Sequence, residues 1–150
     1  MQISKIDLDE EHWTSDYIPI SYTNYLTRKQ LSKSVTFYWA TDYDLHATCR
    51  AYFIDDNRIE IGDIWLSEDQ RGKKIDNVKI SVVFMRKVIS KIWQHFKSCS
   101  VISLLVHNDN IPAIKLYEKL NFVIEKQNIR RKEFNMKNGL LMIRHKQTHK

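Results

Sequence analysis

The chain is poor in the residues that usually interrupt or cross-link a fold. Its 150 residues include only three glycines, two prolines and two cysteines. No Pro- or Gly-rich linker, internal repeat or low-complexity tract divides the sequence, so we expect a single domain over residues 1–150. Cys49 and Cys99 lie far apart in the sequence. We therefore expect two free thiols and a reduced, cytoplasmic protein.

Long apolar runs are also missing. No run approaches the length of about 20 residues that a membrane-spanning helix needs. The N-terminal sequence MQISKIDLDEEHW has neither the basic nor the apolar segment of a secretory signal. The six histidines and two cysteines show no metal-ligand spacing. We therefore expect no membrane insertion and no metal cofactor.

Positive charge is what the chain has in excess, with a formal net charge of +6. This charge favours an anionic partner, such as nucleic acid, a phosphorylated cofactor, an acidic protein or an anionic membrane surface, and does not choose among them. A local cluster, Arg130, Arg131 and Lys132, is suited to the phosphate of a cofactor, an acidic substrate or nucleic acid. A solvated strand edge protected by charge is the simpler interpretation of that cluster.

The first half of the chain has the patterns of β-structure. Residues 2–8 alternate as a strand does, while the polar, aromatic-rich residues 10–33 indicate one or two short helices broken at Pro19. Three runs rich in β-branched and aromatic residues follow, at 35–41, 46–54 and 58–66. Short polar turns between these runs predict an antiparallel meander.

The second half changes to a helical period. Apolar residues recur every three or four positions from Ile75 to about residue 97, which predicts an amphipathic helix. The apolar run 100–106 predicts a strand buried on both faces. Asn110 is a suitable N-cap for a second helix that ends at Asn121. Two final strands, joined across residues 137–139, complete the expected order.

The turn QRGKKIDN, residues 70–77, lies between a predicted strand and a predicted helix, where proteins often bind phosphate. A phosphate cradle needs exposed backbone N–H groups, glycines that allow close approach, and no competing negative charge. This turn has one glycine and an aspartate. Placed at the first turn of the helix, the Asp76 carboxylate would cap the N–H groups that a phosphate would use.

Two motifs carry a resemblance to a known family. The run NDNIPAIKLYEKLNF, residues 108–122, resembles the N-x-x-A-x-x-L-Y-x-x-x-G-F signature of the GNAT superfamily of N-acetyltransferases, with Asn121 in place of the usual glycine. The preceding IWLSEDQRGKKID resembles the acetyl-CoA loop of that family, although Lys74 and Asp76 replace its small residues. The resemblance implies a mixed α+β fold, with a mostly antiparallel sheet of about seven strands flanked by about four helices.

The resemblance also implies a function and its residues. The expected reaction transfers an acetyl group from acetyl-CoA to a primary amine of a small molecule or protein by direct attack. The site would open between the strands that end at Leu66 and His107, with Tyr117 as general acid toward the thiolate. Glu60 and, second, His107 are the candidate bases. The residues implied in acetyl-CoA binding are Leu66, Arg71, Gly72, Lys73, Lys74, Ile75, Asp76, Asn110 and Tyr117.

Two departures from the family pattern keep an alternative open. Leu105 stands where enzymes that acetylate protein N-termini carry a glutamate, which argues against that subfamily. The altered loop is compatible with a catalytically weak or inactive acetyltransferase fold that binds an anionic partner. We do not expect nucleic acid or a membrane as partner of the enzyme, and a homodimer is left open.

Overall fold

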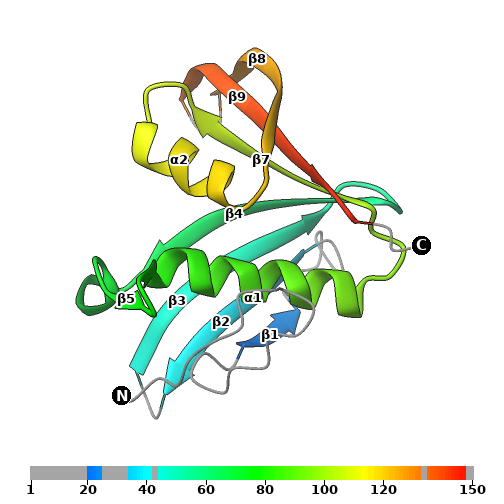
Figure 1. The fold of residues 1–150 in the computed structure, drawn as a ribbon. Coiled ribbons are helices and arrows are strands. Elements are labelled where there is room, and N and C mark those ends of the chain that lie inside the picture. The colour runs from blue at the N-terminus through cyan, green and yellow to red at the C-terminus, as the bar shows by residue number, and fades with distance from the viewer. Residues whose placement is uncertain (1–19, 25–33, 42–43, 133–134, 148–150) are drawn as a thin grey trace.

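The computed structural model describes residues 20–24, 34–41, 44–132 and 135–147, and is dominated by one seven-stranded sheet (Figure 1). The strand order is β1-β2-β3-β4-β7-β9-β8, and every neighbouring pair is antiparallel except β4 and β7. The strands of this sheet are β1 (Ile20–Asn24), β2 (Ser34–Thr41), β3 (Asp44–Phe53), β4 (Arg58–Leu66), β7 (Val101–His107), β8 (Val123–Arg131) and β9 (Met136–His145).

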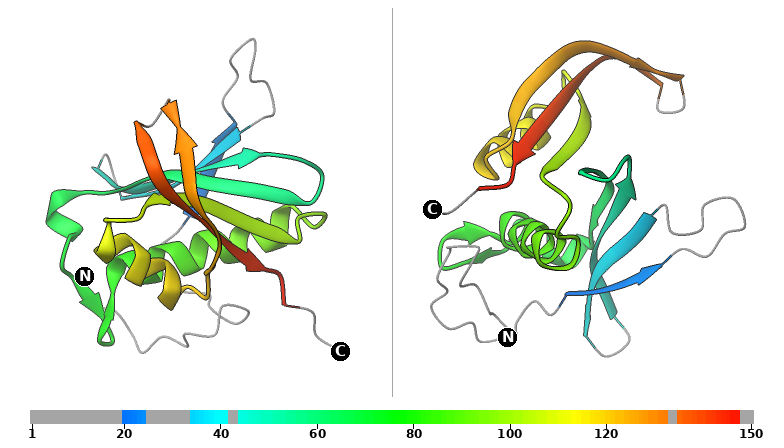
Figure 2. Two further views of the ribbon diagram at one scale, coloured as in Figure 1. Left: turned by 90° about the horizontal axis from the view of Figure 1, so that it is seen from above. Right: turned by 90° about the vertical axis from the view of Figure 1, so that its right-hand side faces the viewer.

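Two α-helices occur in the described part of the chain, α1 (Ile80–His95) and α2 (Ile111–Lys119). They contact each other and lie on one face of the sheet, as Figure 2 (right) shows. The expected mixed α+β fold with a mostly antiparallel sheet is therefore confirmed. The other helices of the expected four would lie in the region 10–33, most of which is outside the described residues. The predicted strand at 2–8 is also outside the described residues.

The β2–β4 meander forms where the sequence predicts it, because its side chains alternate between two environments. Phe37, Cys49, Ile59 and their alternate neighbours are at most 2% exposed and pack against α1. Arg50 and its alternate neighbours lie on the opposite face, because successive residues of a strand point to opposite sides of the sheet. The meander thus has an apolar face under α1 and a more polar face away from it.

The segment 20–24 corrects one sequence-based expectation. The sequence pattern predicts a helical region here, but the segment forms β1, an edge strand antiparallel to β2 with Ile20 opposite Trp39. Its sequence ISYTN contains the β-branched and aromatic residues that suit a strand. The polar character of residues 10–33 as a whole concealed this short strand.

The predicted start of the first helix, at Ile75, is also wrong. Lys74–Ile75 and Val78–Lys79 pair as strands β5 and β6 of a small hairpin, and α1 begins only at Ile80. Asp76 and Asn77 occupy its two-residue turn with φ of 47° and 70°. Positive φ at both positions marks a type I′ turn, in which Asp and Asn are favoured. Asp76 therefore lies in a turn four residues before α1 begins, and the prediction that places it in the first turn of the helix is wrong.

The hairpin makes a prediction about Asp76 that distinguishes a turn from a helix. In a turn with positive φ, Asp76→Gly should be more stable than Asp76→Ala by about 1 kcal/mol, since only glycine adopts that conformation without steric cost. Inside a helix the order would be reversed, with alanine the more stable by about 1 kcal/mol. Urea unfolding of the two variants checks the sign of the difference. A more stable alanine variant would contradict the hairpin.

The second helix forms as predicted. Asn110 caps α2, its side-chain Oδ1 accepting a hydrogen bond from the Ala113 backbone N–H at 3.3 Å, and Pro112 lies in the first turn. Asn121 follows the C-cap residue Leu120 and has φ of 66°. An asparagine tolerates this left-handed conformation, which is the usual reason for glycine after a helix. The replacement of the signature glycine by Asn121 is therefore compatible with the fold.

The connection between the last two strands lies earlier than predicted. Residues 137–139 belong to β9, and the chain turns between Arg131 and Met136. Gly139 pairs with His107 on one side and with Ile129 on the other. A Cβ atom at this position would collide with the Met136 side chain and lie 3.2 Å from the Ile129 carbonyl oxygen. Gly139 is therefore needed for close packing within the sheet. In the sequence alone, the same glycine suggests a turn.

Candidate active site

The sheet opens between β4 and β7. These strands pair in parallel only where Arg58, Ile59 and Glu60 face Val101, Ile102 and Ser103. Beyond this short ladder they diverge, so that β4 continues alongside β3 while β7 continues alongside β9 (Figure 1). The predicted gap between the strands ending at Leu66 and His107 therefore has a counterpart in this divergence.

A β-bulge distorts β4 beside the gap. Arg50 pairs with Gly62 and Thr48 with Trp65, so two residues of β4, Asp63 and Ile64, lie opposite the one residue between Arg50 and Thr48. Asp63 has φ of 50°, a left-handed conformation. A bulge interrupts the hydrogen-bond ladder and changes the direction of the side chains, and bulges are common next to active sites.

A cavity of about 200 Å³ lies at the point where the strands separate. Glu60 and Asp63 of β4, His107 of β7 and Tyr52 of β3 line it, with Leu105 and Met136 among its apolar walls. The structure thus brings together Glu60 and His107, the two candidate bases. Leu105, which the sequence analysis finds in place of the glutamate of the enzymes that acetylate protein N-termini, forms part of the wall.

Glu60 is surrounded by cations. Its side chain is 14% exposed, and Oε1 lies 3.8 Å from Arg58 Nη2 and 4.0 Å from Arg131 Nη2. Arg58 is fixed in turn by a 2.9 Å hydrogen bond from its Nε to Ser103 Oγ. Glu60 Oε1 accepts no hydrogen bond from the described residues. The carboxylate is therefore held by charge attraction, and its Oε1 is a buried acceptor that receives no hydrogen bond within the described residues.

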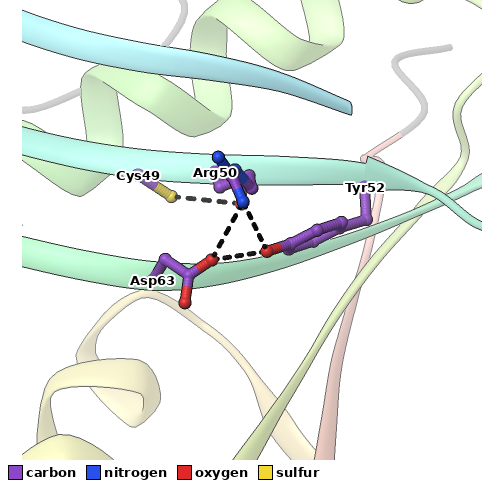
Figure 3. A network of polar contacts seen from close by, with 4 residues as sticks. All are labelled: Cys49, Arg50, Tyr52 and Asp63. Atoms are coloured by element: carbon purple, nitrogen blue, oxygen red, sulfur yellow. Dashed lines mark hydrogen bonds and ion pairs between the residues drawn. The ribbon is translucent and has the colours of Figure 1, made fainter. Parts of the chain in front are cut away.

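Asp63 belongs to a polar network on the same face of the sheet (Figure 3). The Tyr52 hydroxyl donates a hydrogen bond to Asp63 Oδ2, and Arg50 Nη1 lies 3.8 Å from the same oxygen. Arg50 Nη1 also donates to the Tyr52 hydroxyl at 3.4 Å. Burial, and next the hydrogen bond to Asp63, raise the pKa of Tyr52. Sequence reasoning missed Asp63, although Gly-Asp inside a strand is a signal for a bulge.

Tyr117 lies on α2 and does not line this cavity. It packs against the core beside Leu116 and makes an edge-to-face contact with Phe122, with ring centroids 6.2 Å apart. Burial, with a smaller effect from Cys49, raises the pKa of Tyr117 to about 12. The phenol is therefore protonated at neutral pH.

Cys49 and Cys99 are both free thiols, as the sequence predicts, and burial raises the pKa of each.

The predicted acetyl-CoA loop begins where β4 ends. The Leu66 carbonyl oxygen accepts a 3.0 Å hydrogen bond from Arg71 Nε, and a short 3₁₀ helix, Glu68–Gln70, leads into Arg71. Gly72 is exposed and has φ of 80°, a conformation that requires glycine. Ile75, in contrast, is 2% exposed and packs into the core. The Ile75 side chain is therefore not available to a ligand.

The start of α1 is suited to an anion. Its N-cap residue, Lys79, makes no side-chain capping hydrogen bond, and no acidic residue occupies the first turn. The Ile80 N–H donates to the Lys73 carbonyl oxygen at 2.8 Å. Uncapped N–H groups and the helix dipole attract negative charge, and Lys73, Lys74 and Lys79 are exposed nearby. The N-terminus of α1 is thus uncapped in the sense that its N-cap side chain accepts none of these N–H groups.

Neither a cluster of metal ligands nor a membrane-spanning helix occurs within the described ranges. No group of three or more His, Cys, Asp or Glu side chains there is arranged to hold a metal ion. None of the helices found there is long and apolar enough to cross a membrane.

Comparison with known proteins assigns the chain to a family. Residues 5–122 match the acetyltransferase (GNAT) family, and the protein belongs to that family. A search of curated proteins found no match.

Solved structures with the same fold include several acetyltransferases. A GNAT family acetyltransferase from Elizabethkingia anophelis with acetyl-CoA bound has a TM-score of 0.70 at 15% identity, over 87% of this chain and 99% of that one. The N-acetyltransferase PseH of Campylobacter jejuni, in complex with acetyl coenzyme A, has a TM-score of 0.60 at 17% identity over 79% and 72%. A spermidine N-acetyltransferase SpeG mutant from Vibrio cholerae has a TM-score of 0.62 at 17% identity over 76% and 66%. At these identities the likeness establishes the fold alone.

Proposed function

We propose that the protein is an N-acetyltransferase that transfers the acetyl group of acetyl-CoA to a primary amine by direct attack. The observation that carries this proposal is the divergence of β4 and β7 beside a bulge, with Glu60 and His107 in one cavity, in a chain of the GNAT family. PseH and the Elizabethkingia protein are each described with acetyl-CoA bound. SpeG is described as a spermidine acetyltransferase, which supports an amine as acceptor.

The chemistry assigns three tasks to the chain. The acceptor ammonium must lose a proton, its nitrogen then forms a bond to the thioester carbonyl carbon, and the carbon–sulfur bond breaks as the sulfur takes up a proton. We assign removal of the first proton to Glu60 or His107. Tyr117 is proposed to protonate the sulfur, since its pKa of about 12 keeps the phenol protonated until the thiolate forms.

The acetyl-CoA loop fits its proposed ligand. Acetyl-CoA supplies the activated thioester, and its phosphates need cations and backbone donors. We propose that Arg71, Gly72, Lys73 and Lys74 and the uncapped N-terminus of α1 bind these phosphates. The exposure of the three cations and the absence of an acidic residue from the first turn of α1 support this assignment. Calorimetry with acetyl-CoA tests it directly, and saturable binding is expected.

A neutral substitution at each candidate base separates Glu60 from His107. If Glu60 is the base, we expect Glu60→Gln to lower the rate and abolish the acidic limb of the pH–rate profile, because an amide cannot accept the amine proton. His107→Gln should then retain that limb, which makes it the matched control. The reverse pattern would assign the base to His107. Steady-state kinetics with an amine acceptor over a range of pH makes the comparison.

A second candidate function is a weak or inactive acetyltransferase fold that binds an anionic partner. The observation that favours it is the hydrogen bond from Arg71 Nε to the Leu66 carbonyl oxygen, which engages backbone where the pantetheine arm was expected to pair. Such a module should bind its partner in the absence of acetyl-CoA. Strong salt dependence would indicate nucleic acid, which we do not expect. Saturable acetyl-CoA binding followed by thiol release with an amine would exclude this candidate.

The remaining assignments are proposals as well. We propose a cytoplasmic enzyme that needs no metal. A homodimer is left open, and one structure of SpeG from Vibrio cholerae is described as dodecameric.

A further inference from the structure

A second hollow adjoins the Glu60–His107 cavity on the same face of the sheet. It encloses about 290 Å³ and is lined by Thr36, Thr48, Arg50 and Asp63. Asp63 also lines the first cavity, so it is the residue shared by both hollows. The bulge in β4 therefore places one carboxylate at the junction of two spaces. The two hollows are therefore neighbours on this face of the sheet, one beside β2 and β3 and the other beside the gap between β4 and β7.

All four residues that line the second hollow have polar side chains. Two hydroxyl groups, one guanidinium and one carboxylate line it, so its donors outnumber the single carboxylate. Thr36 Oγ1 is buried and has no hydrogen-bond partner among the side chains and backbone that the structure describes. An unpaired buried polar group typically costs about 1–3 kcal/mol. An oxygen of a bound molecule would satisfy this hydroxyl, whereas an aliphatic chain would leave it unpaired.

Asp63 is held in a defined position at the junction. The Tyr52 hydroxyl and Arg50 Nη1 both engage Oδ2, as Figure 3 shows, and this leaves Oδ1 for another cation. Glu60, by comparison, is already placed between two guanidinium groups. A cationic acceptor therefore meets less competition at Asp63 than at Glu60. Neither Arg58 nor Arg131 is paired with Asp63 in the described contacts.

We propose that the two hollows form one acceptor groove, in which Asp63 binds the ammonium group of the acceptor and Thr36, Thr48 and Arg50 bind hydroxyl groups of the same molecule. The acceptor class is then a hydroxyl-bearing primary amine rather than an aliphatic amine or polyamine. This inference depends on the proposed acetyltransferase function. Asp63 is the specificity-determining carboxylate, and Tyr52 is a positioning residue that acts through it.

Matched pairs of amines test the proposed groove in an assay of thiol release from acetyl-CoA. Serinol is compared with isopropylamine, and glucosamine with cyclohexylamine, at equal concentrations of the ammonium form. The expected kcat/KM is at least about tenfold higher for the hydroxyl-bearing member of a pair, as expected where a site hydrogen-bonds hydroxyl groups. A higher kcat/KM for isopropylamine and cyclohexylamine, or transfer to none of the four amines by a protein that binds acetyl-CoA, would overturn the inference.

Three variants test which residues of the proposed groove bind the acceptor amine. Asp63→Asn, which tolerates the positive φ, should raise KM at least about tenfold for all amines and leave the acetyl-CoA Kd unchanged. Thr36→Val, a near-isosteric change, should raise KM for the hydroxyl-bearing amines only. Glu125→Gln removes an exposed carboxylate from β8 and should change neither constant.

The outcomes separate this inference from the function it depends on. An unchanged KM in Asp63→Asn, with acetyl-CoA binding and transfer intact, would overturn the acceptor groove and leave the acetyltransferase function standing. Failure of the wild-type protein to bind acetyl-CoA would instead remove the proposed function. An equal rise of KM for both members of a pair in Thr36→Val would show that Thr36 acts on the fold, and would overturn its role in binding hydroxyl groups.

Discussion

Tyr117→Phe is expected to lower turnover by about one to three orders of magnitude while leaving acetyl-CoA affinity nearly unchanged. The substitution removes only a hydroxyl, and the ring keeps its edge-to-face contact with Phe122 and its place against the core. The lost rate would measure the contribution of the phenol as an acid toward the departing sulfur. Steady-state turnover and calorimetry on the same preparation separate the two effects.

The pH dependence provides an independent check on Tyr117. Because its pKa is raised to about 12 from an ordinary value of 10.0, the neutral buried phenol stabilises the fold fully below pH 10, and this contribution is lost as the pH rises toward 12. Wild type should therefore lose more stability than Tyr117→Phe between pH 10 and 12. Unchanged turnover in the variant, with this stability difference present, would show that Tyr117 is only a core residue.

A negative charge at the start of α1 is expected to weaken acetyl-CoA binding by about tenfold or more. Ser81 lies in the first turn of this uncapped helix, so the carboxylate of Ser81→Asp would occupy the N–H groups and repel the phosphates. The same charge favours the helix dipole, by about 0.3–1 kcal/mol. The free protein should therefore unfold at a higher temperature while its acetyl-CoA Kd rises.

Two control variants isolate the position of that charge. Ser81→Ala removes the hydroxyl without adding charge and should leave the Kd within about twofold. Gln94→Glu adds a carboxylate near the other end of α1, where it opposes the dipole, so it should lower stability slightly without affecting the Kd. Calorimetry and thermal unfolding provide both readouts. A Ser81→Asp variant that binds acetyl-CoA as tightly as wild type would place the phosphates elsewhere.

Much of the fold could be predicted because short stretches of sequence specify it. The alternation in β2–β4, the apolar run of β7 and the Asn110 cap of α2 are local patterns with local physical causes. The family signature around Tyr117 likewise lies in one continuous segment. The gap between β4 and β7 was predicted through the family resemblance, which implies an opening between the strands that end at Leu66 and His107.

The hairpin before α1 and the role of Gly139 could not be predicted, because they depend on backbone dihedral angles and on neighbouring strands that no local sequence pattern shows. Ile75 and Val78 fit a helical spacing as well as a hairpin, and the pair Asp76 and Asn77 decides between them through its positive φ. Gly139 resembles a turn residue until its neighbours in the sheet are known.

The sequence by itself determined the order of most elements and the family, because hydrophobic periodicity and short motifs are properties of neighbouring residues. Only the tertiary structure decided which side chains share a site. Asp63 contacts Tyr52 and Arg50 because a bulge shifts the pairing of β4 with β3. It lines the Glu60–His107 cavity because β4 diverges from β7 after a short parallel ladder. Both facts concern strand pairing between distant segments, and pairing energy depends on the partner strand as much as on the strand itself.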